Sequence, residues 1–267
     1  MLPTSFKEGV ILLHELPNIG IMAVIVGTLL LAVIMGPLIT HRILGLQSSD
    51  KRSSGALNAF NAIAAWAALV IVFSLVQAQG NLRLTEDDIN KEASAFNNMD
   101  RVLLRSSDPT FLNLRPALHA YGRAVIDKEW PLLAHGGRAP EANNAFAALA
   151  RAGYAFQATN SREEAMFGQY VQRMNELSDL RNTRLNNSDL SLPSLFWATI
   201  CMLLLLMVVL ASLVTPAPER TVQVLGMIIA LGILLSQVVI VDLPFSGETS
   251  ASPGPIERML AYSQTRD

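Results

Sequence analysis

Four long stretches of the chain contain no Asp, Glu, Lys or Arg, and most of their side chains are apolar. They cover residues 16–41, 53–82, 190–218 and 221–241. About 20 apolar helical residues cross a hydrocarbon core roughly 30 Å thick, so each stretch is long enough to cross a membrane once. We therefore expect four transmembrane helices, at about residues 19–40, 56–78, 192–214 and 221–241.

The first stretch is interpreted as a retained membrane helix and not as a cleaved signal peptide. The residues before it carry Lys7 together with Glu8 and Glu15, so they are not basic. The stretch ends at Thr40, His41 and Arg42 without the small-residue site at which signal peptides are cut.

A polar insert, residues 80–191, separates the second and third stretches and holds most of the charged residues. Its apolar side chains recur at helical spacing, which is typical of amphipathic helices and not of strands. Two such stripes are Leu82, Ile89, Phe96 and Leu103, then Met166, Tyr170, Met174 and Leu177. Ser161 and Glu164 have the spacing of a capping box, which predicts a helix start there. The insert is predicted to be a small domain of four helices that bury one another's apolar faces.

These patterns predict an all-α, polytopic membrane protein with a helical extramembrane domain inserted between its second and third membrane helices. The expected parts are an N-terminal membrane hairpin (1–79), the helical domain (80–191), a C-terminal membrane hairpin (192–242) and a tail (243–267).

Composition and charge exclude several classes of protein. The 267 residues are 51% hydrophobic and only 16% charged, whereas soluble domains carry about 25% charged residues. A net charge of −2 provides no basic surface for nucleic acid, so no nucleic-acid partner is expected. The single cysteine, Cys201, excludes an internal disulfide.

Catalytic chemistry is not indicated. The four histidines are scattered, none has metal-ligand spacing, and no phosphate-binding or nucleophile motif is present. The acidic pairs 87–88 and 163–164 are interpreted as residues of first helical turns, where carboxylates favour the helix dipole. We expect no enzyme activity, no cofactor and no metal site.

The second stretch carries the candidate pore face. Asn58 and Asn61 lie one helical turn apart, and Ala65, Ala68 and Val72 continue the same face. Small residues let helices approach closely, and amides offer both hydrogen-bond donors and acceptors to an ion. The alternative interpretation is that these amides only bond neighbouring helices.

Asp242 ends the fourth stretch, where a carboxylate opposes the helix dipole. A charge at a membrane boundary usually has a partner or a role, and pairing with an arginine of the insert is the favoured interpretation. The following Pro244, Phe245, Ser246 and Gly247 are expected to turn the tail back toward the insert.

Four short motifs resemble those of a bacterial bestrophin-like family and follow one another in that family's order. The resemblance covers roughly residues 20–262. The most distinctive contains Tyr121 and the run Glu129, Trp130 and Pro131. The others are Glu92-Ala-Ser-Ala, Arg181-x-x-Arg184-Leu with Leu192-Pro-x-x-x-Trp197, and Asp242-Leu-Pro-Phe-Ser-Gly247.

Arg181 and Arg184 are interpreted from their residue types as a solvated or headgroup-facing surface. A ligand clamp is the alternative.

The resemblance implies a remote similarity to bestrophins, which are pentameric anion channels with four membrane helices per subunit and a pore lined by the second helix. It therefore implies a multi-pass protein of the bacterial plasma (inner) membrane that forms a homo-oligomer, with a pentamer favoured, and takes the lipid bilayer and small ions as partners. The alternative is a non-conducting membrane sensor or scaffold whose helical domain binds a protein partner or ligand. A channel should turn Asn58 and Asn61 toward a central axis, whereas a scaffold should bury them within one subunit.

Two arguments about membrane orientation disagree. The short loop after the first helix carries Arg42, Lys51 and Arg52, and Arg220 follows the third helix, whereas the N-terminal segment carries only Lys7. Basic residues in short loops stay cytoplasmic, so the hairpin loops are predicted to face the cytoplasm and the helical domain the outside. The similarity to bestrophins implies the reverse.

Overall fold

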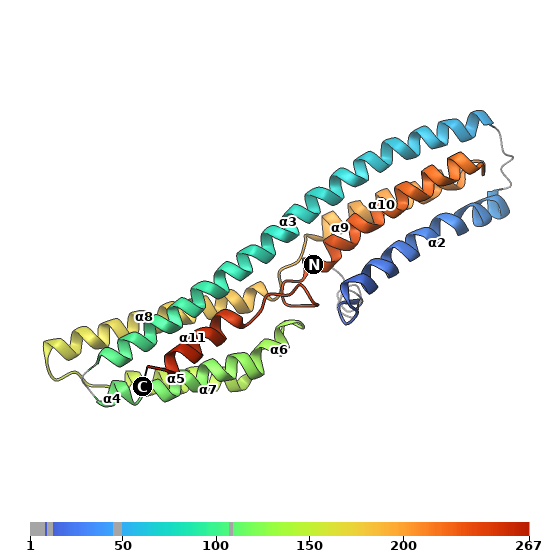
Figure 1. Ribbon diagram of the computed structural model, residues 1–267. Coiled ribbons are helices and arrows are strands. Elements are labelled where there is room, and N and C mark those ends of the chain that lie inside the picture. Colours follow the sequence, from blue (N-terminus) through green and yellow to red (C-terminus); the bar gives the residue numbers. More distant parts are fainter. Residues whose placement is uncertain (1–8, 10–12, 45–49, 107–108, 267) are drawn as a thin grey trace. The chain divides into compact units, whose positions relative to one another are not determined.

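The computed structural model describes residue 9 and residues 13–44, 50–106 and 109–266 (Figure 1). All of the secondary structure in these ranges is helical, which confirms the all-α class. The described residues divide into two compact units, which are treated separately below. The membrane unit comprises the described residues within 1–81, 191–242 and 247–249, and the helical unit comprises those within 82–190, 243–246 and 250–267.

Within the described residues, four helices are long and apolar enough to cross a membrane, as the charge-free stretches predict. They are α2 (Asn18–Leu44), α3 (Asp50–Arg105), α9 (Ser194–Ser212) and α10 (Pro218–Asp242). The second of them, α3, is 56 residues long and continues through Gly80, well beyond its apolar stretch. The pair Asp87 and Asp88 therefore lies in the interior of a helix, and its prediction as part of a first turn is wrong.

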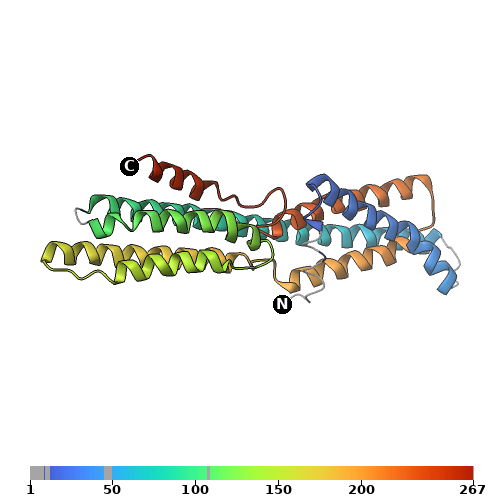
Figure 2. The same cartoon turned by 90° about the horizontal axis from the view of Figure 1, so that it is seen from below.

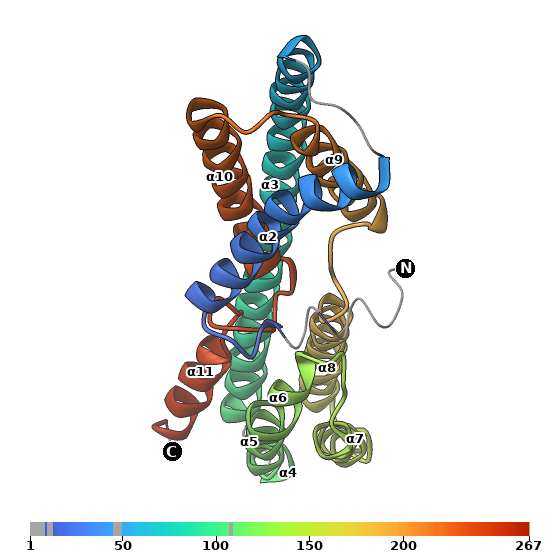
Figure 3. The ribbon, with the colours of Figure 1, turned by 90° about the vertical axis from the view of Figure 1, so that its right-hand side faces the viewer.

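In the membrane unit, α2 packs against both α9 and α10 (Figures 1 and 3). Half of the most apolar window of α10 is buried, compared with 17% for α2. A single copy of the chain thus leaves much apolar helix surface exposed, which suits contact with lipid or with protein.

The helical unit combines the second half of α3 with α4 (Pro109–Leu112), α5 (Arg115–Ala124), η1 (Val125–Glu129), α6 (Trp130–Leu133), α7 (Pro140–Tyr154), α8 (Ser161–Asn187) and α11 (Gly254–Gln264). Helices α4 and α5 run beside α3, and α7 runs beside α8 (Figure 2). Residues 250–266, including α11, belong to this compact unit.

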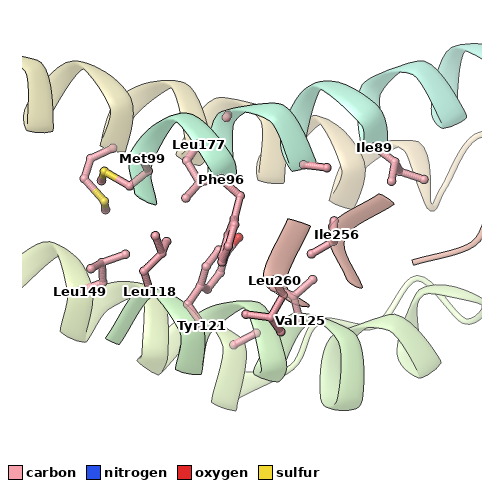
Figure 4. Close-up of a cluster of buried hydrophobic side chains, with 14 of the residues drawn as sticks. Ile89, Phe96, Met99, Leu118, Tyr121, Val125, Leu149, Leu177, Ile256 and Leu260 are labelled. Carbon is pink, nitrogen blue, oxygen red and sulfur yellow. The ribbon is translucent and has the colours of Figure 1, made fainter. Parts of the chain in front are cut away.

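One apolar core joins these helices. Phe96 and Met99 of α3 face Leu118 and Tyr121 of α5, and Leu260 of α11 closes one side (Figure 4). Of the predicted stripe, Ile89, Phe96 and Leu103 are fully buried in this core, and Leu82 is partly buried and packs against it. Helical periodicity was thus sufficient to identify its inward face.

Helix α8 begins one residue earlier than the predicted capping box requires. Asn160 is the N-cap, and its Oδ1 accepts a hydrogen bond from the Glu163 backbone N–H at 3.0 Å. The Glu163 carboxylate accepts hydrogen bonds from Thr159 and from the Asn160 side-chain amide. Asparagine caps a helix at least as well as serine, so the capping pair is Asn160 with Glu163 and not Ser161 with Glu164.

Candidate functional site

The membrane half of α3 has two contrasting faces. Its inward face is a stripe of mostly small buried residues, which are Ala56, Phe60, Ala64, Ala67, Ile71, Ser74 and Ala78. The predicted pore face lies to one side of that stripe. Asn58, Ala65 and Val72 are exposed there, and Asn61 and Ala68 are half-buried.

The two amides of this face have different environments. Asn61 is tied to a neighbouring helix, because the Gln223 side-chain N–H of α10 donates to Asn61 Oδ1 at 3.2 Å. Asn58 is exposed on the surface of the subunit. One amide therefore makes the interhelical bond of the alternative interpretation, while the other is not buried within the subunit.

The family-motif residues of the helical unit meet in a buried cluster of charges. Arg184 donates to both oxygens of Glu92, from Nε at 2.6 Å and from Nη2 at 3.2 Å. The same Nη2 donates to Glu129 at 2.8 Å, and Arg181 Nη2 donates to the other Glu129 oxygen at 2.7 Å. The expectation that Arg181 and Arg184 form a solvated or headgroup-facing surface is wrong, since only 7% and 0% of these residues are exposed. The two carboxylates balance their charge inside the protein.

Aromatic side chains line this charge cluster. The Trp130 ring lies 5.3 Å from the Arg184 guanidinium, and the Phe146 ring lies 5.8 Å from that of Arg181. Tyr121 donates to Glu92 at 3.4 Å. The Nη1 atom of Arg184 is buried and has no hydrogen-bond partner among the described residues. The Trp130 ring lies over the same guanidinium, in the geometry of a cation–π contact.

Glu129 lies at the end of a π-helical turn, which positions its side chain in the cluster. In η1 the pattern of backbone hydrogen bonds widens, and the Trp130 N–H donates to the Val125 carbonyl, five residues back. Pro131 follows and has no N–H to continue the α-helical pattern. Single π-turns of this kind often occur at functional sites. The Glu-Trp-Pro run is thus the sequence signature of the local distortion that presents Glu129.

The cluster fixes the ionisation of its members. Burial disfavours the charged form of Glu129, but hydrogen bonds from Arg181 and the charge of Arg184 outweigh it and lower the pKa of Glu129. Burial likewise opposes the charge on Arg184, yet the adjacent Glu92 raises the pKa of Arg184. Burial, followed by the charge of Glu92, raises the pKa of the Tyr121 hydroxyl well above its usual value. These shifts favour the charged forms of Glu129 and Arg184 and the neutral form of Tyr121.

Residues 242–247, in the turn after α10, make several hydrogen bonds and ring contacts, each within one of the two units. Asp242 Oδ1 accepts from the Leu192 backbone N–H at 2.6 Å in the membrane unit. This backbone amide gives the boundary charge a partner, while the motif arginines of the insert pair with Glu92 and Glu129.

The remaining turn residues have structural contacts of their own. The Pro244 carbonyl accepts from the Ala251 N–H at 2.7 Å, and the Phe245 ring packs on Trp130 at 5.7 Å. Ser246 donates to the Ala134 carbonyl at 3.3 Å. Gly247 has a φ of +78°, a backbone conformation that suits glycine.

A second buried cluster was missed by the sequence analysis. Asp100, which is fully buried, accepts from Arg115 at 2.9 Å and lies 3.4 Å from Arg266. His119 Nε2 lies 2.6 Å from the Ser263 hydroxyl, and Arg115 also donates to the Ser263 carbonyl. These contacts hold α11 on α3 and α5. The only available sequence clue was the position of Asp100 directly after the buried Met99.

The described residues contain no group of three or more His, Cys, Asp or Glu side chains that could hold a metal ion. The site combines a membrane helix that has an exposed, partly polar face with a helical unit that contains the second half of the same helix.

Fold and site together define a multi-pass all-α membrane protein with a helical unit between its second and third spans. The chain belongs to the Bestrophin-like domain family, whose match covers residues 20–256. It is also similar to a solved crystal structure that is described as that of a membrane protein. That match has a TM-score of 0.62 and 10% identity, over 93% of this chain and 96% of the other. At this identity the likeness concerns the fold alone. No curated protein matches the chain.

Proposed function

We propose that this protein is one subunit of an oligomeric, anion-permeable ion channel of the bacterial plasma membrane, and that α3 lines the pore. The observation that carries the proposal is the α3 face on which Asn58, Ala65 and Val72 are exposed. Family membership supports the channel class. The similarity to bestrophins is the basis for the anion preference, and amide N–H groups can solvate an anion. No catalytic reaction is assigned.

Conduction requires more than one subunit. Four packed helices leave little room for a water-filled path of their own, whereas several copies arranged around an axis can enclose one. Trp66, Leu69 and Phe73 of α3 are 62%, 46% and 61% exposed in the single subunit. Lipid or neighbouring subunits must cover such apolar side chains. We propose a closed homo-oligomeric ring, with a pentamer favoured.

Anion flux into liposomes, measured on protein whose stoichiometry is established by native mass spectrometry, tests this proposal. We expect a ring and a protein-dependent anion flux. The double variant Asn58→Leu with Asn61→Leu should lose the flux, because leucine removes the polar groups of the path while being well tolerated in a membrane helix.

Gln223→Leu is the matched control. It removes the α10 partner of Asn61 and leaves both α3 amides in place. If the amides serve the pore, this variant should retain the flux. If they serve only to bond helices, it should behave like the double variant. A monomer, or a ring without flux, would instead favour the non-conducting sensor or scaffold.

We also propose that the short hairpin loops face the cytoplasm and the helical unit the opposite side. Arg52 and Arg220 support this orientation; Lys7 and Ser48 lie outside the described residues, and the side chain of Arg42 is likewise not described. In a Cys201→Ala background, an impermeant maleimide should label Asn144→Cys, on the exposed surface of α7, in intact cells. It should not label Ser48→Cys. The reverse labelling would overturn this orientation.

A further inference from the structure

The membrane unit contains an apolar cavity close to the short α9–α10 loop. Its volume is about 400 Å³, which falls in the range of about 300–1,000 Å³ that holds small ligands. Val33 and Ile34 of α2 line one wall, Ala211 of α9 another, and Val224 and Leu225 of α10 a third. These side chains offer contacts to hydrocarbon.

A cation lines the same cavity. Arg220 lies in the first turn of α10 and is half-buried. Its Nη1 donates to the Ser53 hydroxyl at 2.9 Å, and the Thr215 backbone N–H donates to the same oxygen at 2.9 Å. Ser53 is completely buried. A partly buried hydrogen bond thus holds the guanidinium beside the cavity. The neighbouring Glu219 is exposed and does not line the cavity.

We propose that this cavity binds an anionic phospholipid, with an acyl chain between α2, α9 and α10 and the phosphate beside Arg220. Hydrocarbon walls with a cation at a helix end match an amphipathic anion. The cavity lies where two membrane-spanning helices begin and end, at the level of lipid headgroups. Its volume fits a chain and not a packed helix of a second copy. The site does not depend on whether the protein conducts.

Lipid retention by the purified full-length protein in mild detergent tests the site. Native mass spectrometry with phosphatidylglycerol and phosphatidylcholine of identical acyl chains reports the preference for the anionic headgroup. We expect the wild type to prefer phosphatidylglycerol by about fivefold, the effect of one basic residue at a membrane surface.

Arg220→Gln should lower that preference to about one, and Arg220→Lys should keep most of it. Arg52→Gln is the matched charge control. Arg52 directly precedes Ser53 in the sequence and is exposed, but it does not line the cavity. It should leave the preference unchanged. Ile34→Trp, at a lining residue that is 55% exposed, should fill the cavity and reduce retention of both lipids.

Four outcomes would overturn the site. They are no preference in the wild type, an unchanged preference in Arg220→Gln, an equal loss in Arg52→Gln, and full retention in Ile34→Trp. Displacement of the lipid by inorganic phosphate would assign the site to free phosphate. Absence of any retained lipid would contradict a lipid site in this cavity.

Discussion

At the scale of single residues, the charge cluster shows which part of a site a sequence can disclose. The motifs singled out Glu92, Glu129, Arg181 and Arg184, and the structure brings all four together. Their pairing was not predictable, because the Arg184–Glu92 contact joins residues 92 positions apart. Residue types alone favoured an exposed surface for the arginines, since arginine is rarely buried without a partner. Burial became possible only through carboxylates supplied by distant elements.

Removing one member of this cluster should be costly. Arg184→Gln leaves Glu92 and Glu129 buried without their shared cation, and the loss of one partner of a buried pair typically costs about 3–5 kcal/mol of stability. The control is Arg173→Gln. This substitution breaks the 2.6 Å contact between Arg173 and Glu176, whose side chains are 35% and 40% exposed respectively. It should lower the free energy of unfolding by less than about 1 kcal/mol. Thermal unfolding of the purified protein measures both variants. Equal melting temperatures for the two would contradict a structural role for the cluster.

At the scale of elements, the charge-free stretches and the helical periodicity of the insert indicated the long helices of the described residues but not where each begins or ends. The apolar stretch of α3 ends near Leu82, while the helix runs on to Arg105. A glycine in a helix costs only about 1 kcal/mol, and the buried residues beyond Gly80 outweigh that cost. The π-turn at Val125–Glu129 was not predicted, although Pro131 marks its end. Its hydrogen-bond pattern depends on packing around Glu129 that no local spacing reveals.

Gly153 of α7 lies directly against the ring of Tyr170 of α8. A Cβ at this position would fall within the ring of Tyr170 of α8, whose hydroxyl donates to the Leu149 carbonyl at 2.8 Å. Gly153→Ala should therefore destabilise the protein by about 1–3 kcal/mol, as overpacking does.

Gly168→Ala, on α8 itself, is the control for that substitution. No atom lies within 4 Å of its added Cβ, so the change should stabilise the helix by about 0.5–1 kcal/mol. Denaturant unfolding of both variants measures the difference. A stabilising Gly153→Ala would show that α7 and α8 do not approach as closely as described.

At the scale of the whole molecule, the sequence predicted the class of protein but could not assign its assembly. Charge-free stretches of membrane length are long-range patterns that survive in any single sequence. Subunit contacts leave no such pattern, because the apolar face of a helix such as α3 suits lipid and protein partners equally. The exposure of Asn58 is therefore the observation on which the proposal of a ring depends.

The most direct test of the central claim is the effect of a thiol reagent on single cysteines placed along α3. Ala65→Cys in the Cys201→Ala background puts the only thiol on the exposed pore face, and Leu205→Cys puts it on α9 at a residue that is 66% exposed. A charged, water-soluble methanethiosulfonate should reach the first thiol through the aqueous path and reduce anion flux in liposomes. It should leave the flux of the Leu205→Cys protein unchanged. Unchanged flux in Ala65→Cys, or equal inhibition of both proteins, would contradict a pore lined by α3.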